Sequence, residues 1–117
     1  MAAGAQRYYL GIEDLGGARG STDSLSFQGD SPEALAAELQ LALREPGLFE
    51  RWRALQEDPD EVDPGLGVTD PEATVSARQS DLHVDVLVTT RLPHSILRHR
   101  LNLLIGAHWT LRDVKSA

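Results

Sequence analysis

The stretch at residues 82–91, LHVDVLVTTR, constrains the fold more than any other part of this chain. Apolar and polar side chains alternate along it, and a period of two places successive side chains on opposite faces of a β-strand. The set expected to face a core is Leu82, Val84, Val86, Val88 and Thr90. The set expected on the other face is His83, Asp85, Leu87, Thr89 and Arg91. A half-buried strand of this kind is typical of an antiparallel sheet that is covered on one side only.

Three or four further strands are expected around it. Residues 7–13 alternate through Tyr8, Leu10 and Ile12, and SLSFQGD restores the same period through Leu25 and Phe27. These two segments predict a hairpin with a glycine-rich loop. The segment ATVSARQS predicts a hairpin partner for residues 82–90, and HWTLRDV predicts a short terminal strand.

Helical spacing appears in three places. Residues 32–44 follow the capping candidates Asp30 and Ser31 and begin with Pro32, and Pro46 ends this helix. Leu48, Phe49, Trp52 and Leu55 predict a second, shorter helix. The third is expected to begin at Pro93, to end at Gly106 and to bury a leucine-rich stripe.

The expected element order is therefore ββαα-loop-ββα(β). Hairpins that alternate with helices predict an α+β fold, with an antiparallel sheet of four to five strands and helices on one face. A chain of 117 residues fits one domain, residues 1–117, because domains commonly contain about 100 to 150 residues.

Residues 57–72 separate the two groups of elements. They include three prolines, two glycines and seven acidic residues but no basic residue, so no regular element is expected to persist there. Loops longer than about 12 to 15 residues tend to be functional or mobile. We expect a mobile acidic loop at about residues 57–73.

Charge divides the chain unevenly. Residues 1–77 contain 5 Lys and Arg against 15 Asp and Glu, or −10, whereas residues 78–117 contain 6 against 3, or +3. All four histidines lie in the basic part. The two parts are expected to neutralise each other within the fold, and the alternative is a basic surface for an acidic partner.

Several classes of function are disfavoured. The chain has no cysteine, which removes disulfides, thiolate catalysis and cysteine-ligated metal clusters and fits a cytoplasmic location. No segment reads as a signal peptide, and none approaches the roughly 18 apolar residues of a membrane span.

His83 and Asp85 form the one candidate catalytic pair. Two residues apart on one strand, they leave the same face, and a carboxylate can orient a histidine for general acid–base work. No serine nucleophile with a GxSxG motif accompanies them. A solvated polar face opposite the valine core explains the pair more simply, and we expect no catalytic activity.

No metal or cofactor site is predicted. His94 and His99 are five residues apart, which separates them by about 140° around a helix, whereas two ligands from one helix need a spacing of three or four. The acidic loop opens like an EF-hand at Asp58 and Asp60 but lacks the glycine and the glutamate that follow. Whether the four histidines meet in space is left open.

The leading hypothesis is a cytoplasmic interaction or regulatory domain, without catalytic activity, that forms a homodimer. The residues expected on its interaction surface are Leu87, Arg91, Arg98 and Arg100. Self-association is favoured because small antiparallel sheets leave an uncovered face, and symmetric dimers are the commonest oligomers. Two alternatives stay open: an acid–base or small-ligand enzyme using His83 and Asp85, and weak nucleic-acid binding through Arg98 and Arg100, which the acidic composition disfavours.

Overall fold

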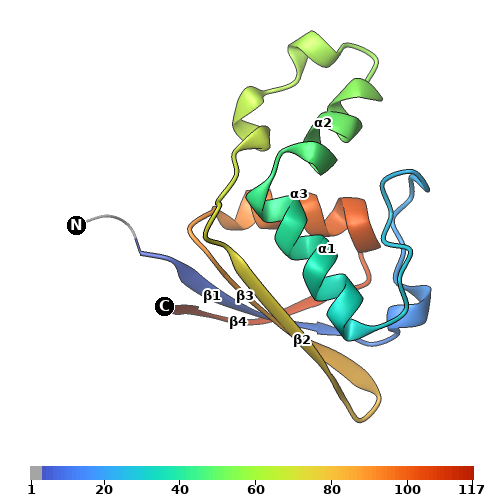
Figure 1. The fold of residues 1–117 in the computed structure, drawn as a ribbon, viewed down its shortest axis with the longest axis vertical. Coiled ribbons are helices and arrows are strands. Elements are labelled where there is room, and N and C mark those ends of the chain that lie inside the picture. Colours follow the sequence, from blue (N-terminus) through green and yellow to red (C-terminus); the bar gives the residue numbers. More distant parts are fainter. Residues whose placement is uncertain (1–3) are drawn as a thin grey trace.

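The computed structural model describes residues 4–117 and contains one four-stranded antiparallel sheet with three α-helices (Figure 1). The strands are β1 (Gln6–Ile12), β2 (Thr74–Ser80), β3 (His83–Thr90) and β4 (Thr110–Ser116). The helices are α1 (Pro32–Arg44), α2 (Gly47–Ala54) and α3 (His94–Ile105). The strands lie in the order β2-β3-β1-β4, which places the first and third strands of the chain at the centre. The predicted α+β class and antiparallel sheet are confirmed.

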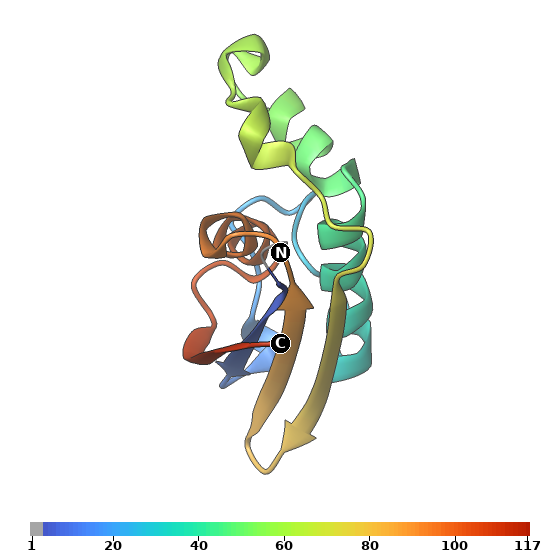
Figure 2. The same ribbon diagram turned by 90° about the vertical axis from the view of Figure 1, so that its left-hand side faces the viewer.

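Helices α1 and α3 lie on the same side of the sheet (Figures 1 and 2). The core between them takes Tyr8, Leu10 and Ile12 from β1 and the predicted valine row from β3. From α1 and α3 it takes the leucine stripes, including Leu35, Leu39, Leu97, Leu101 and Leu104. No described element covers the other side of the sheet.

The predicted second strand around Leu25 and Phe27 is wrong. Both side chains are buried, but the segment is a loop whose Phe27 N–H donates to Leu104 O of α3 at 2.8 Å. Both edges of β1 are already occupied, by β3 and by the terminal strand β4, so no edge remains for a neighbouring hairpin strand. The sheet therefore has four strands rather than five.

The predicted placement of Leu82 in the core is also wrong. Leu82 is 90% exposed because it lies in the turn between β2 and β3, where Asp81 has a φ of 51°. The inward row begins at Val84. The alternating pattern in the sequence begins one residue before β3 does, and the turn directs the Leu82 side chain into solvent.

Helix starts follow the predicted chemistry. The Ser31 side chain caps α1 by accepting the Ala34 N–H at 3.1 Å, with Pro32 as the first helical residue. Pro46 separates α1 from α2, and Pro93 precedes α3. Gly106 ends α3 with a φ of 64°, a conformation that favours glycine.

Helix α2 and the acidic segment after it project away from the sheet (Figure 1). The acidic segment contains two short 3₁₀ turns, Pro59–Glu61 and Pro64–Gly67. It is tied to α2 through Arg53, whose Nε donates to Pro59 O at 3.0 Å. The mobility predicted for residues 57–73 stays a prediction.

Candidate functional site

The uncovered face of the sheet carries polar and apolar side chains in three rows that run across the strands. The cross-strand register places Arg78, Asp85 and Gly11 in the first row, Ser76, Leu87, Tyr9 and Asp113 in the second, and Thr74, Thr89, Arg7 and Lys115 in the third. A groove of about 490 Å³ crosses the first two rows. We call this surface the open face, and Leu87 and Tyr9 form its apolar centre.

Gly11 leaves room on the open face for a neighbouring guanidinium. A Cβ atom at this position would overlap the guanidinium of Arg112, which therefore lies flat over the backbone of β1. Arg112 also approaches Glu13 at 3.9 Å across exposed surface. Because Gly11 has no side chain, the Arg112 guanidinium can lie beside it, and Arg112 also lines the groove.

Asp85 lies between the two arginines of the groove. Arg78 is its register partner on β2, and Gly11, which seats Arg112, is its partner on β1. No carboxylate of residues 4–117 forms an ion pair with Arg78. The Asp85 carboxylate instead accepts a hydrogen bond from His83 Nε2 at 3.0 Å. The groove therefore contains one cation that is free to meet a partner.

The predicted pair of His83 and Asp85 is thus together on the open face. Asp85 lines the groove but His83 does not, and both side chains are partly exposed. No serine or threonine side chain of residues 4–117 forms a hydrogen bond with either of them. The arrangement supplies an oriented histidine without a nucleophile beside it.

Both edges of the sheet are blunted. At β2 the Val75 N–H is taken by the side chain of Gln40 on α1, at 3.0 Å. At β4 the register shifts opposite Tyr9 and Leu10, and Lys115 folds over the Tyr9 ring with its Nζ 5.6 Å from the centroid. Bulges, charges and covering groups at sheet edges oppose pairing with further strands.

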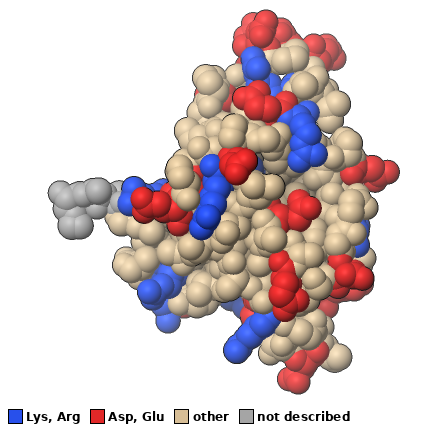
Figure 3. Space-filling model, viewed as in Figure 1, with Lys and Arg blue, Asp and Glu red and all other residues tan. Residues whose placement is uncertain are grey.

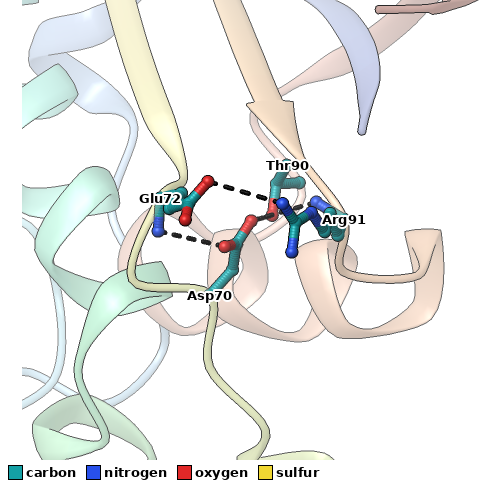
Figure 4. A network of polar contacts seen from close by, with 4 residues as sticks. All are labelled: Asp70, Glu72, Thr90 and Arg91. Atoms are coloured by element: carbon teal, nitrogen blue, oxygen red, sulfur yellow. Dashed lines mark hydrogen bonds and ion pairs between the residues drawn. The ribbon is translucent and has the colours of Figure 1, made fainter. Parts of the chain in front are cut away.

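A second polar cluster lies on the helix side, where Asp70 joins the acidic segment to the end of β3 (Figure 4). Asp70 is 7% exposed, and its carboxylate accepts hydrogen bonds from Thr90 Oγ1 at 2.8 Å and from the N–H groups of Arg91 and Glu72 at 3.0 Å each. Burial alone would raise the pKa of Asp70, but these three hydrogen bonds and the Arg91 charge outweigh it and lower the pKa below its usual value. We call these contacts the Asp70 clasp.

Arg91 takes part in the clasp mainly through its backbone. Its guanidinium is exposed and pairs with Glu72 at 3.4 Å. Exposed pairs of this kind contribute little, about 0 to 1 kcal/mol. Of the residues predicted for the interaction surface, Arg91 is exposed just beyond the end of β3 and Leu87 is half-buried on the open face.

Arg100 is not on the surface where the sequence placed it beside Arg98. Its side chain is 0% exposed, and Nη2 donates to Leu66 O at 2.8 Å and to Val68 O at 3.0 Å. The guanidinium lies 5.9 Å from the centroid of the Phe49 ring. Arg98 remains exposed, so α3 does not present the paired arginines on which the nucleic-acid alternative depended.

The histidines lie apart. His94 stacks on Tyr8 with centroids 6.0 Å apart, His99 packs edge-on against Trp52 at 4.5 Å, and His108 is exposed before β4. Within residues 4–117, no three His, Asp or Glu side chains are grouped so as to hold a metal ion. Likewise, no helix in this range is long and apolar enough to cross a membrane.

Sequence reasoning missed the groove and the Asp70 clasp. The seat for Arg112 depends on Gly11 facing a bulged neighbouring strand, and the clasp joins residues 20 positions apart. The available signal was a lone glycine on the outward side of an alternating strand, which often marks close approach of another group. Asp70 gave no local signal because it is one of seven acids in its segment.

Acidic side chains gather over the projecting segment at the top of Figure 3. Comparison of the chain with models of protein families, with curated proteins and with solved structures finds no match in any of the three.

Proposed function

We propose that this chain is an interaction domain without catalytic activity, and that it associates with a second copy of itself through the open face. The observation that carries the proposal is the apolar centre of Leu87 and Tyr9, which no described element covers. Partly exposed aromatic and aliphatic side chains at the centre of a polar rim are the usual anatomy of an interface. A cytoplasmic location belongs to the same proposal and rests on the absence of cysteine.

The face is favoured over the edges for association. Gln40 occupies an edge amide of β2, and the bulge and Lys115 disturb the edge of β4. Adding a strand at either edge would have to displace these groups. Packing two sheets face to face requires no such change, because facing sheets interdigitate their side chains at about 10 Å separation.

Charges on the open face set the expected response to salt. The open face carries four basic and two acidic side chains, an excess of two positive charges in a chain of net charge −7. The basic ones are Arg7, Arg78, Arg112 and Lys115, and the acidic ones are Asp85 and Asp113. Two copies of this face repel each other weakly, so an apolar contact between them should tighten as salt screens the repulsion. An acidic partner would show the opposite trend.

Sedimentation equilibrium of Leu87→Arg and Leu55→Arg variants tests the proposal. Leu87 lies at the centre of the open face, whereas Leu55 is 57% exposed beyond the end of α2 and serves as the matched control. Facing arginines in a symmetric contact would be buried and unpaired, so Leu87→Arg is expected to sediment as a monomer. The unchanged chain and Leu55→Arg are expected to sediment as dimers, more completely at high salt.

Monomers of the unchanged chain at every salt concentration would refute self-association. A dimer that survives Leu87→Arg would place the contact elsewhere. Binding of acidic peptides that weakens with salt would identify a different class of partner for the same face.

A second candidate, acid–base chemistry at His83 and Asp85, is favoured by their 3.0 Å hydrogen bond. It requires a substrate that reaches His83 from the groove lined by Asp85. Loss of a measured activity in both His83→Gln and Asp85→Asn, with Leu55→Arg unaffected, would favour this candidate over the interaction domain.

A further inference from the structure

Helix α2 and the acidic segment after it cover a buried positive charge, that of Arg100. The Arg100 guanidinium is fully buried and donates only to the carbonyl oxygens of Leu66 and Val68. Its Nε and Nη1 atoms are buried without a hydrogen-bond partner, and no described carboxylate forms an ion pair with it. A buried cation without a counter-charge is costly, and such groups need a physical explanation.

Residues 66–68, here named the strap, are held between this cation and α2. Gly67 touches the Phe49 ring so closely that a Cβ atom there would lie 2.6 Å from a ring carbon. Arg100 lies near the same ring and grips the carbonyls on either side of Gly67. The strap and α2 therefore cover Arg100 together.

His99 sits next to this cation under the same cover. Its ring packs edge-on against Trp52 of α2 at 4.5 Å, and both ring nitrogens are buried without a partner. The charged side chains of α2 have partners elsewhere. Arg53 pairs with Glu50 at 3.8 Å and with Asp60 at 3.4 Å, and Arg51 donates to Ser24 O at 3.3 Å. The charge that acts on His99 is that of Arg100 on the same helix.

The half-buried His99, whose ring nitrogens are both buried, favours the neutral form in this environment. Burial, and then the neighbouring Arg100 charge, lower the pKa of His99 from its ordinary value of 6.5. A proton on the ring would add a second uncompensated cation beside the first. Water could hydrate both cations, Arg100 and protonated His99, if the strap and α2 moved away from them.

We propose that the strap and α2 form an acid-sensitive cover, which opens when His99 takes up a proton while the sheet and its core stay folded. The strap and α2 project from the rest of the molecule in Figures 1 and 2, and within α2 Leu48 joins the core cluster. Peripheral elements open at lower free energy than central strands. The device is independent of the open face, which lies on the other side of the sheet. Opening would expose Phe49, Trp52 and the strap.

The direction of the pH effect follows from the two states. The open state binds a proton with the ordinary affinity of histidine and the closed state binds it more weakly, so acid favours opening. The contribution of neutral His99 to closure is present above pH 6.5 and is lost as the pH falls below that value. If the closed state takes up no proton at pH 5, the population of the open state rises about 30-fold relative to pH 8.

Hydrogen exchange of the whole chain at pH 8 and pH 5, corrected for the intrinsic rate at each pH, tests the proposal. Amides of α2 and residues 59–68 should lose protection by about 30-fold, and amides of β1 and β3 should keep theirs. His99→Phe keeps a ring against Trp52 without a titrating group and should abolish the change. His83→Gln, which removes a histidine from the open face, should leave it intact.

Three results would overturn the proposal. They are equal loss of protection in the sheet, a full acid response in His99→Phe, or unchanged protection at pH 5. If His99→Phe does not fold, the imidazole signals of the unchanged chain decide by NMR. Titration of His99 near pH 6.5 with the strap and α2 still protected would also overturn it.

Discussion

The acidic segment is fastened at two points, and the buried charge is compensated at one of them but not at the other. At one end Asp70 accepts three hydrogen bonds, from Thr90, Arg91 and Glu72, and its negative charge is favoured in place. Two to four residues earlier in the segment, at Val68 and Leu66, Arg100 makes two hydrogen bonds and leaves two nitrogens without partners. Burial also lowers the pKa of Arg100, which means that its charged form is disfavoured there.

The difference shows that burial of a charge does not by itself stabilise a fold. A buried carboxylate surrounded by N–H and O–H donors replaces most of the hydrogen bonds that it made to water. A buried guanidinium with two of its nitrogens unpaired does not. The Asp70 clasp should therefore fix the segment to the sheet, and the strap should hold only weakly. Three substitutions measure this contrast.

The largest effect is expected from Asp70→Ala. Removing the carboxylate leaves the donors of Thr90, Arg91 and Glu72 without their acceptor and should lower the free energy of unfolding by about 3 kcal/mol at neutral pH. Urea unfolding measures this change. Because the folded pKa of Asp70 lies below its unfolded value of 3.8, the stabilisation is present above pH 3.8 and is lost as the pH falls below it. The variant and the unchanged chain should then converge in acid, and a constant difference would contradict the assignment.

A smaller effect is expected from Gly67→Ala. The new methyl group would press on the Phe49 ring, and overpacking of this kind costs about 1 to 3 kcal/mol. Thermal unfolding should show a lower midpoint. Gly47→Ala is the control, because nothing lies within 4 Å of a Cβ atom at that position. Equal behaviour of the two variants would mean that the strap does not pack on Phe49.

The smallest effect is expected from Arg100→Met. The substitution sacrifices two hydrogen bonds to the strap but removes an uncompensated cation, so the two terms should nearly cancel, to within about 1 kcal/mol. Urea unfolding again supplies the measurement. A cost as large as that of Asp70→Ala would show that Arg100 is as well compensated as Asp70, and the contrast between the two fastenings would fail.

Local patterns predicted most of the elements. The alternation of β1 and β3 and the Ser31-Pro32 start of α1 appear in the structure as expected, because each depends on residues close in sequence. The same reasoning failed for Leu25 and Phe27, whose alternation reflects two buried contacts in a loop against α3. A period of two over three residues cannot distinguish a strand from such a loop.

The candidate sites divide in the same way. His83 and Asp85 share a face because strand geometry alone requires it. The burial of the Arg100 side chain could not be predicted from the residues around it in the sequence. Arginines beside a leucine stripe usually reach solvent, whereas this one binds carbonyls 34 and 32 residues away.

The sequence by itself determined the α+β class, the start of the first helix, the end of the third and which side of β3 faces the core, because these follow from backbone geometry, end signals and the period of apolar side chains. Tertiary structure alone decided that β4 rather than residues 24–28 pairs with β1, and that Gly11 seats Arg112. It also decided that Asp70 is satisfied while Arg100 is not. These outcomes depend on which distant groups arrive at the same place, and no local pattern encodes that meeting.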